Sequence, residues 1–171
     1  MEADDLRELI LQVYAARREA KEWLEFYLNP DIKKKLEETS ANLNKEFNRR
    51  HRHMPACRIT RLKAILANFE SYQPEDDMIA SLYVSVTSSL IQYVRIEYPS
   101  DAFCKSVLRF MISTITLIDK KGLFDKFFPK LTEEINRVFP AGSPAVNYYR
   151  ADIDESIENY VIKRSLEPVR Q

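Results

Sequence analysis

Glycine is rare in this chain. Gly122 and Gly142 are the only two glycines among 171 residues, against an average of about 7 % in proteins. Glycine-rich loops that cradle phosphate groups and hairpin turns that depend on glycine are therefore not expected.

Cysteine and histidine are equally scarce, with two residues of each. Two cysteines are too few for a disulfide framework or a four-thiolate zinc site. His51, His53 and Cys57 form one short run of metal-ligand types, but the arginines beside them would repel a cation. Neither Cys57 nor Cys104 has a base placed to activate it, and no catalytic triad emerges. We therefore expect no metal, no other cofactor and no enzymatic activity.

No excess of charge of either sign is present, since 26 basic and 26 acidic side chains give a net charge of zero. Attraction to nucleic acid or to a membrane would have to be local. The acidic N-terminus lacks a following apolar core, so we expect a reduced, cytoplasmic protein without a signal peptide. Residues 78–94 carry no charge, but this run is shorter than the roughly 18 residues of a membrane span and contains several hydroxyl groups. We expect no membrane association.

Two strongly apolar patterns meet at Pro99 and form the centre of the expected fold. In residues 75–98 and 101–121 apolar side chains recur every three or four positions, which is typical of helices. Leu82, Val84 and Val86 also alternate as in a strand, but the helical pattern is the longer one. Gly122 is the expected left-handed stop of the second helix. The two segments predict a buried αα-hairpin.

The remaining patterns predict five further helices, at about residues 4–28, 30–50, 59–69, 123–139 and 143–165, with 140–144 as a loop. The first of these places eight residues in one core stripe: Leu6, Leu9, Ile10, Val13, Ala20, Leu24, Tyr27 and Leu28. The last is expected to bury Val146, Tyr149, Ile153, Ile157, Tyr160 and Val161. We predict one all-α domain spanning 1–171, with about seven antiparallel helices in an irregular bundle or a short superhelical stack of αα-hairpins.

Residues 45–63 form a basic corner. They contain seven positive side chains and one acid, Glu46, for a local net charge of +6. A chain reversal at Pro55 would gather these cations into an anion- or nucleic-acid-binding patch. The helix dipole also explains arginines near a helix C-terminus, and only Phe47 offers a ring for base stacking. The candidate binding residues are Arg49, Arg50, Arg52, Arg58 and Arg61.

Trp23, Phe26 and Tyr27 supply more aromatic surface than one core stripe requires. Core packing is one explanation, and a partner interface is the other, because Trp and Tyr are common interface anchors. The function that we favour is a non-enzymatic protein-interaction module, with another protein or a homo-oligomer as partner. The alternative is nucleic-acid or acidic-partner binding through the basic corner.

Three short motifs carry a family resemblance: residues 26–30 (FYLNP), residues 45–47 (KEF) and residues 122–127 (GLFDKF). By these motifs the chain resembles a domain-of-unknown-function family of small helical cytoplasmic proteins common in Bacteroidetes. The resemblance implies an all-α fold and a bacterial cytoplasmic origin. It implies no catalytic residue, cofactor or substrate.

Overall fold

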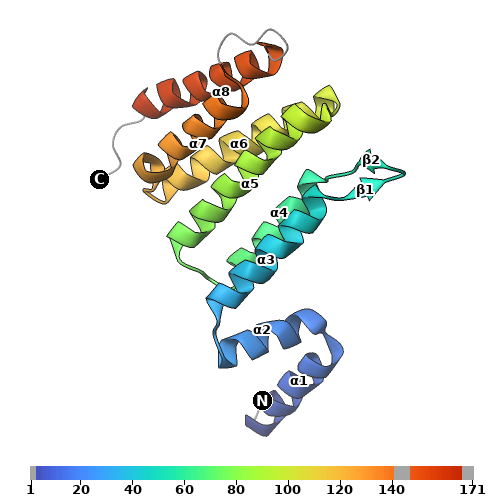
Figure 1. The fold of residues 1–171 in the computed structure, drawn as a ribbon. Helices are drawn as coiled ribbons and strands as arrows, with labels where there is room; N and C mark the ends of the chain where they lie inside the picture. Colours follow the sequence, from blue (N-terminus) through green and yellow to red (C-terminus); the bar gives the residue numbers. More distant parts are fainter. Residues whose placement is uncertain (1–2, 141–146, 167–171) are drawn as a thin grey trace.

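The structure, a computed structural model, describes residues 3–140 and 147–166. Within them the chain is all-α, as predicted, apart from one short β-hairpin (Figure 1). The elements are α1 (Ala3–Ala16), α2 (Arg18–Leu28), α3 (Ile32–Phe47), β1 (Arg50–His51), β2 (Met54–Pro55), α4 (Ile59–Glu70), α5 (Asp76–Glu97), α6 (Asp101–Lys120), α7 (Phe124–Val138) and α8 (Asn147–Leu166).

Helix α5 lies at the centre of the stack. It packs against α6 and α7, and it also contacts α3 and α4. Side chains on more than one face are buried: Ile79, Ala80, Leu82, Val84, Val86, Thr87, Leu90, Ile91, Tyr93 and Val94. The helical interpretation of this segment is confirmed, and the strand alternative is wrong. An apolar helix of this kind has to be covered on several sides.

The other helices form successive layers about α5. Helix α3 pairs with α4, α7 lies against α5 and α6, and α8 packs on α6, so that α8 and the α1–α2 hairpin lie at opposite ends of the stack (Figure 1). Gly122 ends α6 as predicted, with a left-handed φ of 68°. Its N–H donates to the Asp119 carbonyl at 2.9 Å, and the Leu123 N–H donates to the Ile118 carbonyl at 2.8 Å. These bonds satisfy carbonyls that the helix end leaves free.

The single first helix that we expected is two helices. The backbone of Arg17 is extended, with φ −129° and ψ 114°, and the chain turns back there. No residue of α1 or α2 is buried, so the predicted core stripe is wrong: Leu9 is 47 % exposed and Leu28 is 75 % exposed. The amphipathic pattern remains helical, but the two short helices cover one another only in part and do not reach the core of the stack.

The second expected helix ends at Phe47 instead of Arg50, and a β-hairpin follows it. The chain reverses at Arg52 and His53, not at Pro55. Both residues have positive φ, 49° and 65°, as the central pair of a two-residue hairpin loop requires. The hairpin turn thus forms without glycine, at a place where we predicted no strand.

The last helix is described from Asn147. Its expected start at Ser143, most of the predicted loop and Val146 lie outside the described residues. Ile153 is buried, but Val161 is 42 % exposed, so its assignment to the core is wrong. Among the helices that the structure describes, none meets both requirements of a membrane span, length and apolar content.

A pair of buried hydroxyl groups joins α5 and α6. The Oγ1 atoms of Thr87 and Thr114 lie 2.9 Å apart, and both residues are fully buried. Each hydroxyl is also within bonding distance of a carbonyl of its own helix, Tyr83 at 2.8 Å and Phe110 at 3.1 Å. Each hydroxyl has only one proton, so the three bonds share two protons.

We expect Thr87→Val and Thr114→Val each to lower the free energy of unfolding by about 1 kcal/mol, because a buried hydrogen bond is lost. The double variant should lose less than the sum of the two, because either single substitution already removes the bond between the two hydroxyls and the second cannot remove it again. Urea unfolding of the wild type, the two single variants and the double variant gives the coupling free energy between the two hydroxyl groups. Strictly additive losses would contradict a bond between the two helices.

Candidate functional site

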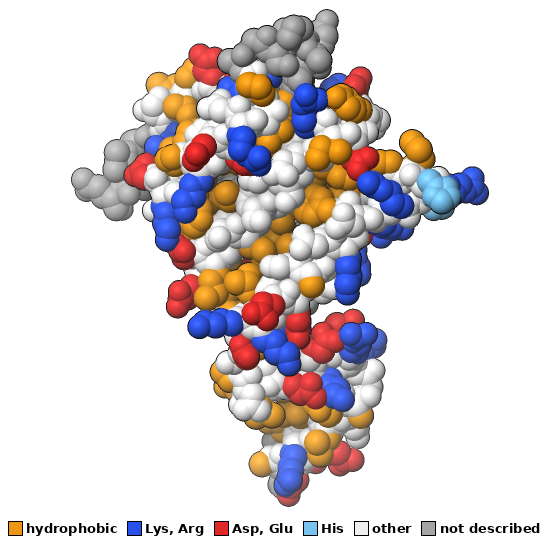
Figure 2. Space-filling model, viewed as in Figure 1, with side chains coloured by type: hydrophobic (Ala, Val, Ile, Leu, Met, Phe, Trp, Pro, Cys, Tyr) orange, Lys and Arg blue, Asp and Glu red, His pale blue; other side chains and the backbone are white. Residues whose placement is uncertain are grey.

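The α1–α2 hairpin carries a group of exposed apolar side chains, which we call the apolar hairpin face. In Figure 2 hydrophobic side chains lie over the narrow lower lobe that this hairpin forms. The face consists of Leu6, Leu9, Ile10, Val13, Trp23 and Tyr27. Their exposed fractions range from 41 % at Val13 to 70 % at Tyr27. Soluble proteins rarely expose so many apolar side chains together unless the surface binds something.

The three aromatic residues predicted as a partner interface have different positions. The rings of Trp23 and Tyr27 stack at the surface, with centroids 5.6 Å apart. Phe26 points to the body, and its ring meets the buried Tyr72 edge-on at 4.7 Å. Trp23 and Tyr27 therefore belong to the apolar hairpin face, whereas Phe26 anchors the hairpin to the rest of the protein.

Polar contacts hold the two short helices together. The Tyr14 hydroxyl of α1 donates to a Glu25 carboxylate oxygen of α2 at 2.9 Å, and this hydrogen bond raises the pKa of Tyr14. The Lys21 ammonium lies 5.5 Å from the centre of the Tyr14 ring. The hairpin thus has defined cross-contacts, although no residue in it is buried.

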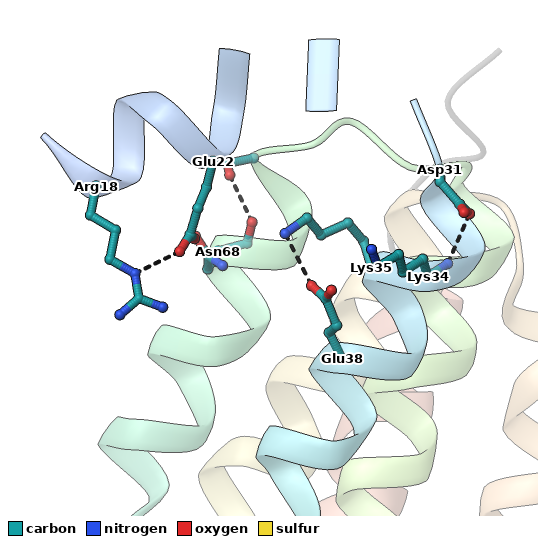
Figure 3. A network of polar contacts seen from close by, with 8 residues as sticks. Arg18, Glu22, Asp31, Lys34, Lys35, Glu38 and Asn68 are labelled. Atoms are coloured by element: carbon teal, nitrogen blue, oxygen red, sulfur yellow. Dashed lines mark hydrogen bonds and ion pairs between the residues drawn. The ribbon is translucent and has the colours of Figure 1, made fainter. Parts of the chain in front are cut away.

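An open cleft of about 800 Å³ separates the hairpin from α3 and α4. Its walls are polar and carry four basic and four acidic side chains, among which Arg18 binds Glu22 at 2.7 Å and Lys35 binds Glu38 at 3.1 Å (Figure 3). In Figure 2 the junction is a band of mixed red and blue side chains. Because opposite charges neutralise one another here, this cleft has no field that would select a charged ligand.

In the basic corner, two acids form ion pairs with three of the five candidate arginines. Glu46, which is 8 % exposed, accepts hydrogen bonds from the Arg58 backbone N–H at 3.0 Å and from its Nε at 3.4 Å. The same carboxylate lies 3.7 Å from Arg49. Arg50 binds Glu97 at 2.7 Å. Glu97 is 47 positions further along the chain, so a local count of charges could not have found it.

The remaining candidates, Arg52 and Arg61, are exposed and have no ion pair with any described residue. Arg52 lies at the tip of the β-hairpin, which projects from the body (Figures 1 and 2). His51 and His53 are exposed on this hairpin, whereas Cys57 is buried. No group of three or more metal-ligand side chains gathers in the part of the chain that the structure describes.

Cys57 is isolated from solvent beside the basic corner. Burial, reinforced by the nearby Glu46, raises the pKa of its thiol to about 12. Its backbone N–H faces the Tyr93 hydroxyl at 3.4 Å. The reactive thiolate is therefore almost absent near neutral pH.

We expect Cys57 in the Cys104→Ser variant to react with a disulfide reagent at pH 8 on the order of a hundredfold more slowly than free cysteine, because its thiol stays protonated and the higher nucleophilicity of its thiolate offsets this only in part. The rate should rise with pH and reach that of free cysteine in denaturant. The absorbance of the thiolate released from the reagent measures the reaction rate. The Cys57→Ser variant, which keeps only Cys104, is the matched control. Rapid reaction of folded protein at pH 8 would contradict this environment.

Comparisons of the chain with protein-family models, with curated proteins and with solved structures found no match. The resemblance to a Bacteroidetes family therefore stays a prediction.

Within the apolar hairpin face, the prediction of a core position is wrong for the stripe of α1. Leu6, Leu9, Ile10 and Val13 were assigned to the core because they share one stripe, and a stripe indicates only that a face is covered. One signal was available. Leu11 lies on the opposite side of the helix from that stripe, which is unusual for a helix with one buried face.

Proposed function

We propose that this protein is a non-enzymatic interaction module that binds a protein partner through the apolar hairpin face. The observation that carries the proposal is that no residue of α1 or α2 is fully buried, despite their apolar side chains. Trp23 and Tyr27 add a stacked aromatic pair of the kind that anchors protein interfaces.

The energetics favour a covered hairpin. Helices of 14 and 11 residues are marginal in water unless an apolar face is packed. Burying a Leu or Ile side chain completely is worth about 1.5–3 kcal/mol, so each half-exposed side chain retains roughly 1 kcal/mol for a partner. Several such side chains together supply enough free energy for binding, even after the entropic cost of association.

A photo-reactive amino acid tests this surface. With benzophenone-alanine in place of Leu9, irradiation of cells that express the full chain should give cross-linked products, because a partner covers this position. Val13→Asp in the same chain should remove the products, since it puts a charge into the apolar contact. Electrophoresis and mass spectrometry identify the adducts.

The matched control carries the photo-reactive group at Ile162, which is 51 % exposed on α8. Products of equal yield from Ile162, or none from Leu9, would contradict the proposed function. Adducts with another protein support it as fully as adducts with a second copy of this chain.

A second candidate function rests on the projecting β-hairpin, which presents exposed basic side chains away from the body. Phosphate groups on single-stranded nucleic acid would bind the cations that acids leave free, namely Lys45, Arg52, Arg61 and Lys63. The ion pairs of Arg49, Arg50 and Arg58 reduce what the corner can offer.

On this candidate, the affinity for a labelled RNA 12-mer should fall with salt, with a log–log slope no steeper than about −3, because at most four cations each contribute about −0.7. Arg52→Glu with Arg61→Glu should weaken binding. Glu46→Gln should strengthen it, since Arg49 and Arg58 lose their acid. Fluorescence anisotropy measures the affinity of the wild type, of the double arginine variant and of Glu46→Gln. The absence of binding by the wild type at low salt would contradict this function.

A further inference from the structure

We infer that the α1–α2 hairpin is a hinged arm, which turns as one unit about residues 29–31 and so widens and narrows the cleft between itself and the body. The contact between Phe26 and Tyr72 is the latch that holds the arm in the position described above. The inference concerns the junction between hairpin and body, and it does not depend on what covers the apolar hairpin face. Because the arm carries this face, the hinge sets the direction in which the face points.

The junction between α2 and the body has few contacts. Among the described residues, α2 forms neither a hydrogen bond nor an ion pair with the body. Its polar bonds stay within the hairpin: Arg18 binds Glu22 in α2 itself, and Glu25 accepts from the Tyr14 hydroxyl of α1. Figure 3 shows that the ion pair on each wall of the cleft likewise lies within one helix. Units that share so small an interface are expected to move relative to each other.

The linker between α2 and α3 contains few torsions that can turn. The Asn29 N–H donates back to the Glu25 carbonyl at 3.1 Å, and the Asp31 carboxylate accepts from the Lys34 N–H at 3.0 Å, so each end of the linker is bound to its own helix. The ring of Pro30 fixes its own φ and restricts the conformation of Asn29. The torsions that remain soft are ψ of Pro30 and φ of Asp31. A few such positions at the ends of rigid elements are enough for a hinge.

Tyr72 supplies the body side of the latch. Its side chain is 8 % exposed, and the Phe26 ring meets it edge-on with centroids 4.7 Å apart. The Lys35 ammonium lies 5.0 Å from the centre of the Tyr72 ring. Tyr72 and Lys35 both belong to the body, so this half of the latch stays in place when Phe26 leaves it. One aromatic pair contributes modestly to stability, so we expect latched and released arms to coexist at equilibrium.

Double electron–electron resonance on the full chain tests the hinge. Spin labels at Gln12→Cys in α1 and Ala64→Cys in α4, both exposed positions, measure the distance between arm and body in a chain with Cys57→Ser and Cys104→Ser. We expect two distances in this otherwise wild-type chain. Phe26→Ala should raise the ratio of released to latched arms on the order of tenfold, because the latch is lost.

Two further variants test the parts of the hinge separately. Tyr27→Ala is the matched control for the latch, because this neighbouring ring is 70 % exposed and does not face Tyr72. It should leave the ratio unchanged. Pro30→Gly should broaden both distances, because glycine frees the torsions that the proline ring restricts.

Two further label pairs separate movement of the arm from unfolding. Labels at Arg7→Cys and Glu19→Cys lie within the hairpin, and labels at Ala64→Cys and Glu133→Cys lie within the body; all four positions are exposed. Each of these pairs should give one distance, and Phe26→Ala should leave both distances unchanged.

A single distance between positions 12 and 64 that neither Phe26→Ala nor Pro30→Gly changes would overturn the hinge. Two distances whose ratio is the same in Phe26→Ala would overturn the role of Phe26 as the latch. A change within the hairpin pair would show that α1 and α2 separate, which would overturn movement of the arm as one unit.

Discussion

Burial of α5 on several faces is the constraint on which the body of the protein depends. The segment from Met78 to Val94 has no charged side chain, so exposing it to water would cost the apolar free energy of many residues. Helices α3 and α4 cover one side, and α6 and α7 cover the others. Within this core, the hydroxyl groups of Thr87 and Thr114 bond to each other and to carbonyls of their own helices. The layered order of the later helices follows from covering α5.

The same constraint explains why this part of the fold was predictable and the N-terminus was not. In α5 and α6 apolar residues surround most of the helix. Both helices therefore had to be buried, and only neighbouring helices of the same chain could cover them. The stripe of α1 has a single face. It predicts that something covers Leu9 and Ile10, but it does not say whether the cover is the core, α2 or another chain. Nothing in Ala15 to Arg18 marks the break at Arg17, since none of these residues disfavours a helix strongly.

The basic corner shows a second limit of reasoning from sequence. Local composition correctly located a group of cations, but the charge that a ligand meets depends on acids brought in by tertiary structure. Glu46 is near in sequence and turns inward to Arg58, and Glu97 reaches Arg50 from the end of α5. The β-hairpin depends on positive φ at Arg52 and His53, residues that seldom adopt it. Sequence alone therefore gives the number of cations in the corner, but not which of them an acid contacts.

These two regions differ in what they require from a partner. The body satisfies its own apolar residues, and the cations of its corner are partly neutralised from within, so neither needs a ligand for stability. The α1–α2 hairpin is joined to that body through Phe26, beside a cleft with equal numbers of basic and acidic side chains. These contacts fix the position of the hairpin but do not give it a core of its own. A partner that covered the hairpin would supply this core, and its binding free energy would add to the stability of α1 and α2 by mass action. Because the junction is polar and narrow, that gain would be confined to the hairpin. The arrangement suits a module whose binding element is stabilised by its partner while its body stays unchanged.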